Sequence, residues 1–322
     1  MNYTDNEMCT ILLSSYIGIE DNTEIKPLSL GEWNRFVDIL IKNKLEPSIA
    51  YSHEISTLKE FGYDELFIER IKKLVGRGAS VAFELEEYEN RGINVLTFIN
   101  KKYPIMLKRQ LKNKMPPVLY YSGDISLVNK VGIGVVGSRN ITVDGVEFTD
   151  KLVKKAAEER LVIFSGGAKG VDMTSQTVAI NNGGAVVAYI ADSLVSRIKK
   201  RDISKNISDG KLLLISDLKP NAGFSAGRAM NRNKLIYASA MGTFVVESEY
   251  NKGGTWTGAT EAMKNKWGKV LVWNNDIEGN KKLIEQGGIA YDLKSEKLLD
   301  VISKQYDSSK EVEYKQISLK DI

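Results

Sequence analysis

The chain has 322 residues, 43% of them hydrophobic and 27% charged, which is enough to bury the core of one large domain and one smaller domain. No stretch reaches the roughly 18 consecutive apolar residues that a membrane helix needs, and the first residues lack the basic segment of a secretory signal. One cysteine excludes an internal disulfide, and one histidine makes histidine-based triads and metal sites implausible, so we expect a metal-free cytoplasmic protein without a cofactor. The net charge of +4 permits an anionic partner but does not require one.

Residues 1–85 are predicted to form a small helical domain of a SAM-like or accessory kind. Ser29 and Glu32 have the spacing of a capping box and precede apolar residues at helical intervals. Further helices are expected over residues 5–17 and 64–74. A docking role is favoured over the reading of duplex DNA, because the segment lacks a basic recognition helix.

A strand is predicted at residues 93–97 and another at 118–121. The second strand follows the paired prolines Pro116 and Pro117, which favours a place at the edge of a sheet. We expect this strand to extend the sheet that begins at Val131.

From residue 131 onward the chain alternates strand, loop and helix, which predicts a parallel sheet covered by helices. The expected strands are residues 131–136, 161–164, 185–190, 212–215, 243–246 and 269–273. We therefore expect an α/β protein with an extended Rossmann-like fold and a mostly parallel sheet over residues 86–280. Residues 281–322 are expected to form small terminal elements and a polar tail.

Four loops of this region carry glycines together with a cation or a hydroxyl. In a parallel sheet all four would open at the carboxyl edge, where ligands of open α/β sheets bind. Glycine lets the backbone approach a ligand, and the N–H groups at a helix N-terminus attract anions. One such loop alone is often only a tight turn, but four in one domain indicate a phosphate-binding pocket. The residues expected to contact phosphate are Gly137, Ser138, Arg139, Ser165, Gly166, Gly167, Lys169, Gly170, Arg232, Asn233, Lys234, Lys252, Gly254 and Thr255.

The loops match neither of the common nucleotide-binding fingerprints. The chain has no Gly-Lys followed by Ser or Thr, as a Walker A loop would. Gly132 and Gly134 fall inside the predicted strand rather than after it, so the dinucleotide fingerprint is also missing. Hydride transfer and ATP hydrolysis are therefore not expected.

Two further groups of residues have competing interpretations. The basic run at residues 196–201 is interpreted by default as a solvated helix face rather than a contact with nucleic acid. Phe224, Tyr250 and Trp256 are candidates for stacking on the bases of a single strand, but core packing is favoured for each.

The ordered motifs of this region resemble those of the DprA/Smf family of DNA-processing proteins. They are Gly-Ser-Arg at 137–139, Ser-Gly-Gly-Ala-Lys-Gly-Val-Asp at 165–172, Asn-Arg-Asn-Lys at 231–234 and Gly-Gly-Thr-Trp-Thr at 253–257. The resemblance covers roughly residues 90–275. It implies a homodimer, not an enzyme, that binds single-stranded DNA with its phosphates against these motifs. It also implies help in loading a RecA-type recombinase, or in DNA uptake and protection during natural transformation.

Some positions differ from the family pattern. Members usually have leucine and arginine where this chain has Gly167 and Lys169, and Lys234 replaces the last arginine of Arg-Asn-Arg. Lysine still pairs with phosphate, but it lacks the planar fork of arginine. Residues 191–209 lack the usual glycine and Tyr-Pro features of the family, and a C-terminal winged helix is not expected, because the chain ends soon after Trp273.

Three classes of function remain open, with single-stranded-DNA binding favoured. The alternative is a nucleotide-binding sensor or a nucleotide-hydrolysing enzyme that uses the same pocket, with Glu247 as the reactive carboxylate, whereas Asp172 is interpreted as a helix N-terminal residue. For both carboxylates a structural role is favoured, in which they cap loops and orient Arg or Lys. The third class is an interaction protein whose DNA site has decayed.

Overall fold

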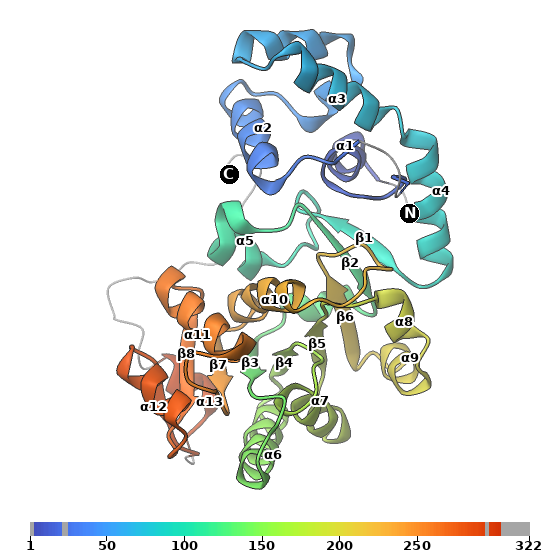
Figure 1. The fold of residues 1–322 in the computed structure, drawn as a ribbon. Helices are drawn as coiled ribbons and strands as arrows, with labels where there is room; N and C mark the ends of the chain where they lie inside the picture. The colour runs from blue at the N-terminus through green and yellow to red at the C-terminus, as the bar shows by residue number, and fades with distance from the viewer. Residues whose placement is uncertain (1–2, 21–24, 294–295, 304–322) are drawn as a thin grey trace. The chain divides into compact units, whose positions relative to one another are not determined.

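The computed structural model describes residues 3–20, 25–293 and 296–303, which divide into two compact units (Figure 1). Among the described residues, the first unit contains those up to 103 and residues 113–120; the second contains residues 104–112 and 121–303. The domain boundaries expected at 85/86 and 280/281 stay a prediction, and the expected polar tail lies outside the described residues. Every helix in the described ranges is too short or too polar to cross a bilayer.

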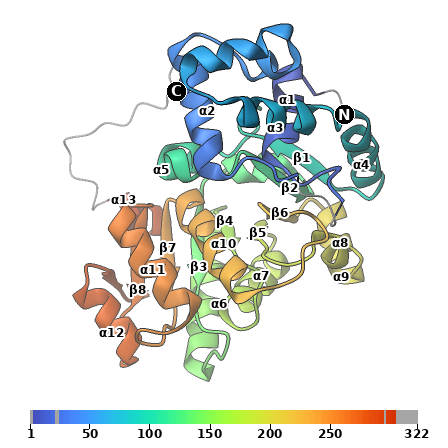
Figure 2. The same cartoon turned by 45° about the horizontal axis from the view of Figure 1, so that its top comes forward.

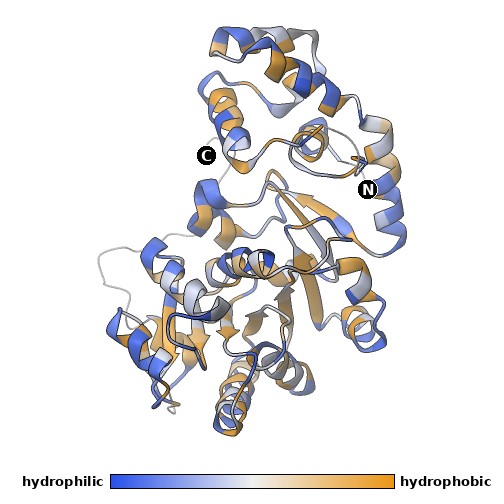
Figure 3. Ribbon diagram, viewed as in Figure 1, coloured by the Kyte–Doolittle hydropathy of each residue, from blue (hydrophilic) through white to orange (hydrophobic). Residues whose placement is uncertain are grey.

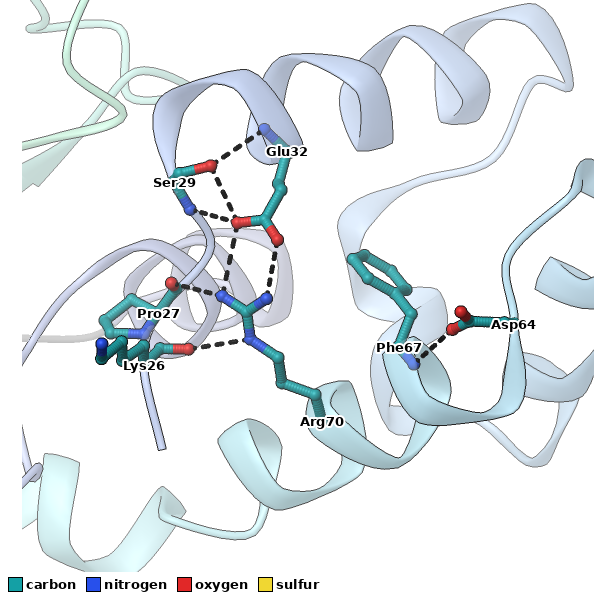
Figure 4. Close-up of polar contacts among 7 residues, drawn as sticks. All are labelled: Lys26, Pro27, Ser29, Glu32, Asp64, Phe67 and Arg70. Carbon is teal, nitrogen blue, oxygen red and sulfur yellow. Dashed lines mark hydrogen bonds and ion pairs between the residues drawn. The ribbon is translucent and has the colours of Figure 1, made fainter. Parts of the chain in front are cut away.

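The first unit contains four α-helices among its described residues. They are α1 (Asp5–Ser14), α2 (Leu30–Lys42), α3 (Glu65–Val75) and α4 (Gly78–Asn90), with 3₁₀ turns η1 (Pro47–Tyr51) and η2 (His53–Phe61) between α2 and α3. Of these, α1, α2 and α3 lie where helices are predicted from the sequence. Trp33 and Phe36 of α2 are buried, and their ring centroids are 6.1 Å apart. Asp64 caps α3 by accepting the N–H of Phe67 at 2.8 Å (Figure 4).

The predicted capping box at the start of α2 is present and has an additional cationic partner. Ser29 Oγ accepts the N–H of Glu32 at 3.3 Å, and the Glu32 carboxylate accepts the N–H of Ser29 at 2.7 Å. Arg70 of α3 donates to the same carboxylate at 2.7 Å and to the carbonyls of Lys26 and Pro27 at 3.0 and 2.7 Å (Figure 4). These bonds from the guanidinium lower the pKa of Glu32 to about 2.

The described residues form a nine-stranded sheet with the strand order β1-β2-β6-β5-β4-β3-β7-β8-β9. The strands are β1 (Asn94–Thr97), β2 (Val118–Ser122), β3 (Gly132–Val136), β4 (Val162–Ser165), β5 (Val186–Tyr189), β6 (Leu212–Ser216), β7 (Gly242–Val245), β8 (Lys269–Trp273) and β9 (Ile289–Tyr291). Every pairing from β6 through β9 is parallel. The expected α/β class with a mostly parallel sheet is confirmed.

The edge position predicted for the second strand was wrong. β2 lies between β1 and β6, and all five of its residues are buried. Proline has no N–H to donate to the neighbouring strands, which restricts it inside a sheet. Pro116 and Pro117 precede β2, so every residue of the strand keeps its N–H and this restriction does not apply.

The second unit carries the helices that position the loops at the carboxyl edge of the sheet. They are α5 (Ile105–Leu111), α6 (Val143–Glu158), α7 (Val171–Asn181), α8 (Leu194–Ile198), α9 (Arg201–Ser208), α10 (Ala226–Ser239), α11 (Gly253–Asn265), α12 (Glu278–Glu285) and α13 (Leu298–Ser303). α6 packs against α7 and α10 against α11, and β3, β4 and β5 lie between α10 and the α6–α7 pair (Figures 1 and 2). The strands are largely hydrophobic and the helices two-sided, as a core between these layers requires (Figure 3).

The strand order reverses next to β3. From β3 the chain adds β4, β5 and β6 on one side and then β7, β8 and β9 on the other. Such a reversal leaves a crevice at the carboxyl ends of the two strands beside it, here β3 and β7. Gly132 and Gly134 lie within β3, as expected: a Cβ at Gly132 would overlap the Val162 carbonyl, and one at Gly134 would overlap the Thr243 side chain.

We predict that Glu32→Gln destabilises the protein at neutral pH and has a smaller effect in acid. The folded pKa of about 2 lies below the ordinary 4.5, so the stabilisation is complete above 4.5 and is lost as the pH falls toward 2. The Glu32 side chain is 40% exposed, so screening by water should keep the loss below about 2 kcal/mol. Urea unfolding at a series of pH values measures it, with the exposed Glu60→Gln as the control. A difference independent of pH would contradict the prediction.

Candidate functional site

A cleft of about 360 Å³ opens at the carboxyl ends of β3 and β7, where the strand order reverses. Its walls are residues 136–140 at the end of β3, residues 226–237 of α10, and residues 249–255 at the start of α11. Eight of the fourteen residues predicted to bind phosphate line it. They are Gly137, Ser138, Arg139, Arg232, Asn233, Lys252, Gly254 and Thr255.

The most deeply placed cation of the cleft is Arg232 of α10, which is only 5% exposed. Its Nη1 donates to the carbonyl of Tyr189 at the end of β5. Asp172 of α7 lies beside it: burial raises the pKa of the Asp172 carboxyl, and the charge of Arg232 opposes that rise. Gly166 lies under the pair, because a Cβ there would overlap the guanidinium and lie 2.6 Å from Asp172 Oδ2. Gly166 is thus needed for the packing of Arg232.

Two buried donors that line the cleft have no partner among the described residues. They are Nε of Arg232 and the hydroxyl of Tyr237, which is 1% exposed. A buried polar group without a partner is unfavourable, so these two donors are the groups in the cleft wall that most need an acceptor.

The start of α11 offers backbone donors to the same cleft. Its N-cap residue, Lys252, makes no side-chain cap, so no side chain occupies the first N–H groups of the helix. Asn233 Nδ2 donates to the carbonyl of Gly254 at 2.9 Å and fixes this turn against α10. An uncapped helix N-terminus favours an anion, since the aligned peptide dipoles leave partial positive charge there.

The loop at residues 165–170 packs onto the loop after β3. Gly170 has φ +78°, a Cβ there would overlap the Ser138 carbonyl, and the N–H of Val171 donates to that carbonyl at 3.2 Å. Ala168 lines the cleft, so the loop forms part of its margin. The glycines of this loop therefore serve the close approach of two backbones.

Six predicted phosphate ligands do not line the cleft. They are Ser165, Gly166, Gly167, Lys169, Gly170 and Lys234. Ser165 is fully buried and donates to the Val135 carbonyl at 3.1 Å, whereas Lys169 is exposed. Lys234 interacts with Asp217, where burial raises the pKa of the carboxyl and the lysine charge lowers it. A role of these six in phosphate binding stays a prediction.

The structural role favoured for the two carboxylates is confirmed. Glu247 is 3% exposed, and its carboxylate accepts the N–H of Thr142 at 3.2 Å and the Thr142 hydroxyl at the start of α6. Asp172 accepts the N–H of Ala168 at 3.3 Å and lies against Arg232.

The three candidate aromatic residues differ in burial. Trp256 is 6% exposed, so core packing is confirmed for it. Tyr250 is 42% and Phe224 57% exposed, so core packing was wrong for these two. The guanidinium of Arg139, at the cleft, lies 5.5 Å from the ring centroid of Phe224. Phe224 therefore offers an exposed ring face beside a cation that lines the cleft.

Arg197 was not among the residues predicted to form the site. The interpretation of residues 196–201 as a solvated face holds for Lys200 and Arg201, which are exposed, but the Arg197 side chain is only 20% exposed. Its guanidinium pairs with Asp192 at 2.9 Å and donates to the carbonyl of Gly167 at 3.1 Å. Asp192, just after a buried strand and five residues before the arginine, was the available signal.

We predict that Gly170→Ala destabilises the protein more than Gly183→Ala. Both glycines have positive φ, +78° and +76°, so both substitutions carry a strain of about 1–3 kcal/mol. Only at Gly170 does the new Cβ also overlap a backbone carbonyl, whereas Gly183 has nothing within 4 Å. Thermal unfolding of both variants measures the difference, and equal losses of stability would contradict the close packing of the two loops.

Comparison with known proteins gives a consistent assignment. The family model described as DNA recombination-mediator protein A matches residues 94–303. The chain is 29% identical to the DNA processing protein DprA of Bacillus subtilis over 64% of this chain and 70% of that protein. It is 30% identical to DprA of Streptococcus pneumoniae over 43% of this chain, and there it spans about half (49%) of that relative's length.

Solved structures have the same fold. The crystal structure of DprA from Streptococcus pneumoniae matches with a TM-score of 0.68 at 20% identity, covering 90% of this chain and 95% of that one. A structure of DprA from Helicobacter pylori, whose title describes a single-stranded-DNA binding mode, matches with a TM-score of 0.50 at 24% identity over 61% of this chain and 89% of that one. The resemblance to the DprA/Smf family is thereby confirmed, and the chain belongs to the DNA recombination-mediator protein A family.

Proposed function

We propose that the protein is a DNA-processing protein that binds single-stranded DNA in the cleft at the carboxyl ends of β3 and β7, and that it is not an enzyme. The observation that carries the proposal is the cleft itself, which combines cations, an uncapped helix N-terminus and two buried donors without partners. A phosphate group suits these donors and cations, because it is negatively charged and its oxygens only accept hydrogen bonds. The relatives' names and the neighbouring structure's title support this proposal.

A single strand suits the site better than a duplex. Phe224 and Tyr250 are exposed, and Phe224 lies beside Arg139 of the cleft. Unpaired bases stack on such rings, whereas a duplex keeps its base faces inside.

The wider role follows from membership of the family. We propose that the protein is a cytoplasmic homodimer that holds single strands for a RecA-type recombinase, in recombination or in DNA uptake and protection. Nucleotide hydrolysis is the weaker candidate, because Thr142 engages the Glu247 carboxylate and Asp172 is buried against Arg232.

We predict that labelled single-stranded oligonucleotides bind more tightly than duplexes of equal length in fluorescence anisotropy, and that affinity falls with salt. Arg139→Ala should raise the Kd about tenfold, because an arginine–phosphate contact is a charge-assisted hydrogen bond. Lys264→Ala is the matched control: Lys264 is exposed and does not line the cleft. Equal affinity for single strands and duplexes, or no binding at low salt, would contradict the proposed function.

We predict that Phe224→Ala weakens single-strand binding by about 1–3 kcal/mol, the range measured for stacking on one base, and that Phe224→Tyr restores it. Val143→Ala, which removes another exposed apolar side chain, serves as the control. The same anisotropy titration measures all three variants. Unchanged affinity of Phe224→Ala would exclude stacking on this ring.

A further inference from the structure

Two side-chain hydrogen-bond donors lie close to Gly167. A Cβ at Gly167 would lie 3.4 Å from Arg197 Nη1 and 3.7 Å from Gln176 Nε2, with Ile190 Cγ2 at 3.6 Å. The family pattern described above has leucine at this position, and an apolar side chain there would meet these two donors. Gly167, with φ +65°, has no side chain to contact these donors.

Gln176 is the buried member of this pair. It is 6% exposed, and its Nε2 has no hydrogen-bond partner in the described part of the chain. It lies on α7 one turn after Asp172, so the two side chains project from the same side of the helix. A buried amide without a partner weakens folding, so its presence calls for an acceptor from outside the chain.

Arg197 is held in place beside the same space. Asp192 accepts from its Nε at 3.0 Å and pairs with Nη2 at 2.9 Å, while Nη1 donates to the Gly167 carbonyl at 3.1 Å. A guanidinium has five N–H donors, more than these contacts engage. These contacts orient the Arg197 guanidinium before any ligand binds, and its remaining N–H groups can still donate to an acceptor above Gly167.

Exposed cations continue from Arg197. The N–H of Lys200 donates to the Arg197 carbonyl at 3.1 Å. This bond closes the turn that joins α8 to α9, directly after Arg197. Lys199, Lys200 and Arg201 are exposed at this turn, and within the described ranges none of them makes an ion pair.

We propose that Gln176 and Arg197 form a second phosphate-binding position above Gly167, outside the cleft, and that a bound DNA strand continues from it over Lys200 and Arg201. The proposal rests on the proposed function, because the strand is the one held in the cleft. Both side chains offer donors, so the group they take has acceptors only, as a phosphate diester has. The site then spans more nucleotides than the cleft alone.

Gln176→Leu tests the second position, with oligonucleotides of about 4 and about 16 nucleotides, the range of site sizes in single-strand-binding folds. Leucine keeps the volume and removes a polar group that has no partner, so the melting temperature should stay equal or rise. The Kd of the long strand should increase about tenfold and that of the short strand should not change. A lower melting temperature with unchanged affinity would show a structural role and overturn the proposal.

Lys200→Gln/Arg201→Gln tests the continuation of the strand on exposed side chains that folding does not need. Long-strand affinity should fall, and the slope of log affinity against log salt should decrease by about 0.7 for each phosphate that the variant no longer neutralises. Lys264→Gln/Lys266→Gln removes the same charge from exposed positions at the other end of α11 and should leave both unchanged. Wild-type protein that binds neither length would refute the proposed function. Wild-type protein that binds both, with long-strand affinity kept in the Gln176 and Lys200/Arg201 variants, would refute only the second position.

Discussion

The carboxyl edge of the sheet is organised around a buried cation, the guanidinium of Arg232. It contacts the end of β5 through the Tyr189 carbonyl, and it interacts with Asp172 of α7 above the backbone of Gly166. A buried cation is stable only if carboxylate and carbonyl oxygens replace the water around it. This requirement holds α10, which carries Arg232, and α7, which carries Asp172, in place at the carboxyl edge from opposite faces of the sheet.

The glycines at this edge have two different purposes. Gly166 and Gly170 make room for protein groups, namely the Arg232 side chain and the Ser138 carbonyl. Gly254 lies at the start of α11 in the cleft wall, and Gly167 lies beside the buried amide of Gln176, where we propose that phosphates bind. A glycine-rich motif is therefore partly scaffold and partly binding surface, and only the neighbouring atoms distinguish the two.

Much of the fold could be predicted because apolar strands and amphipathic helices alternate so regularly after residue 131. The strands predicted at 212–215 and 243–246 correspond to β6 and β7 within a residue or two. The cleft was predicted in part, since topology brings loops to one edge but does not orient side chains. Ser165 turns into the sheet and Arg197 turns inward, and both depend on which carbonyl lies within reach of a side chain. The exposure of Phe224 was missed because an aromatic residue in sequence carries no sign of what covers it.

The place of β3 in the strand order determines which walls of the cleft can form before the whole chain is synthesised. Gly134 of β3 pairs with Thr243 of β7, yet β4, β5 and β6 lie between them along the chain. A chain synthesised only as far as β6 can pair β3 through β6, but it contains neither α10 nor α11 and so lacks two of the three walls of the cleft. Contacts between distant segments form slowly, since a long loop must close first. The ability to hold a ligand is thus acquired late in folding, after most of the sheet that supports it already exists.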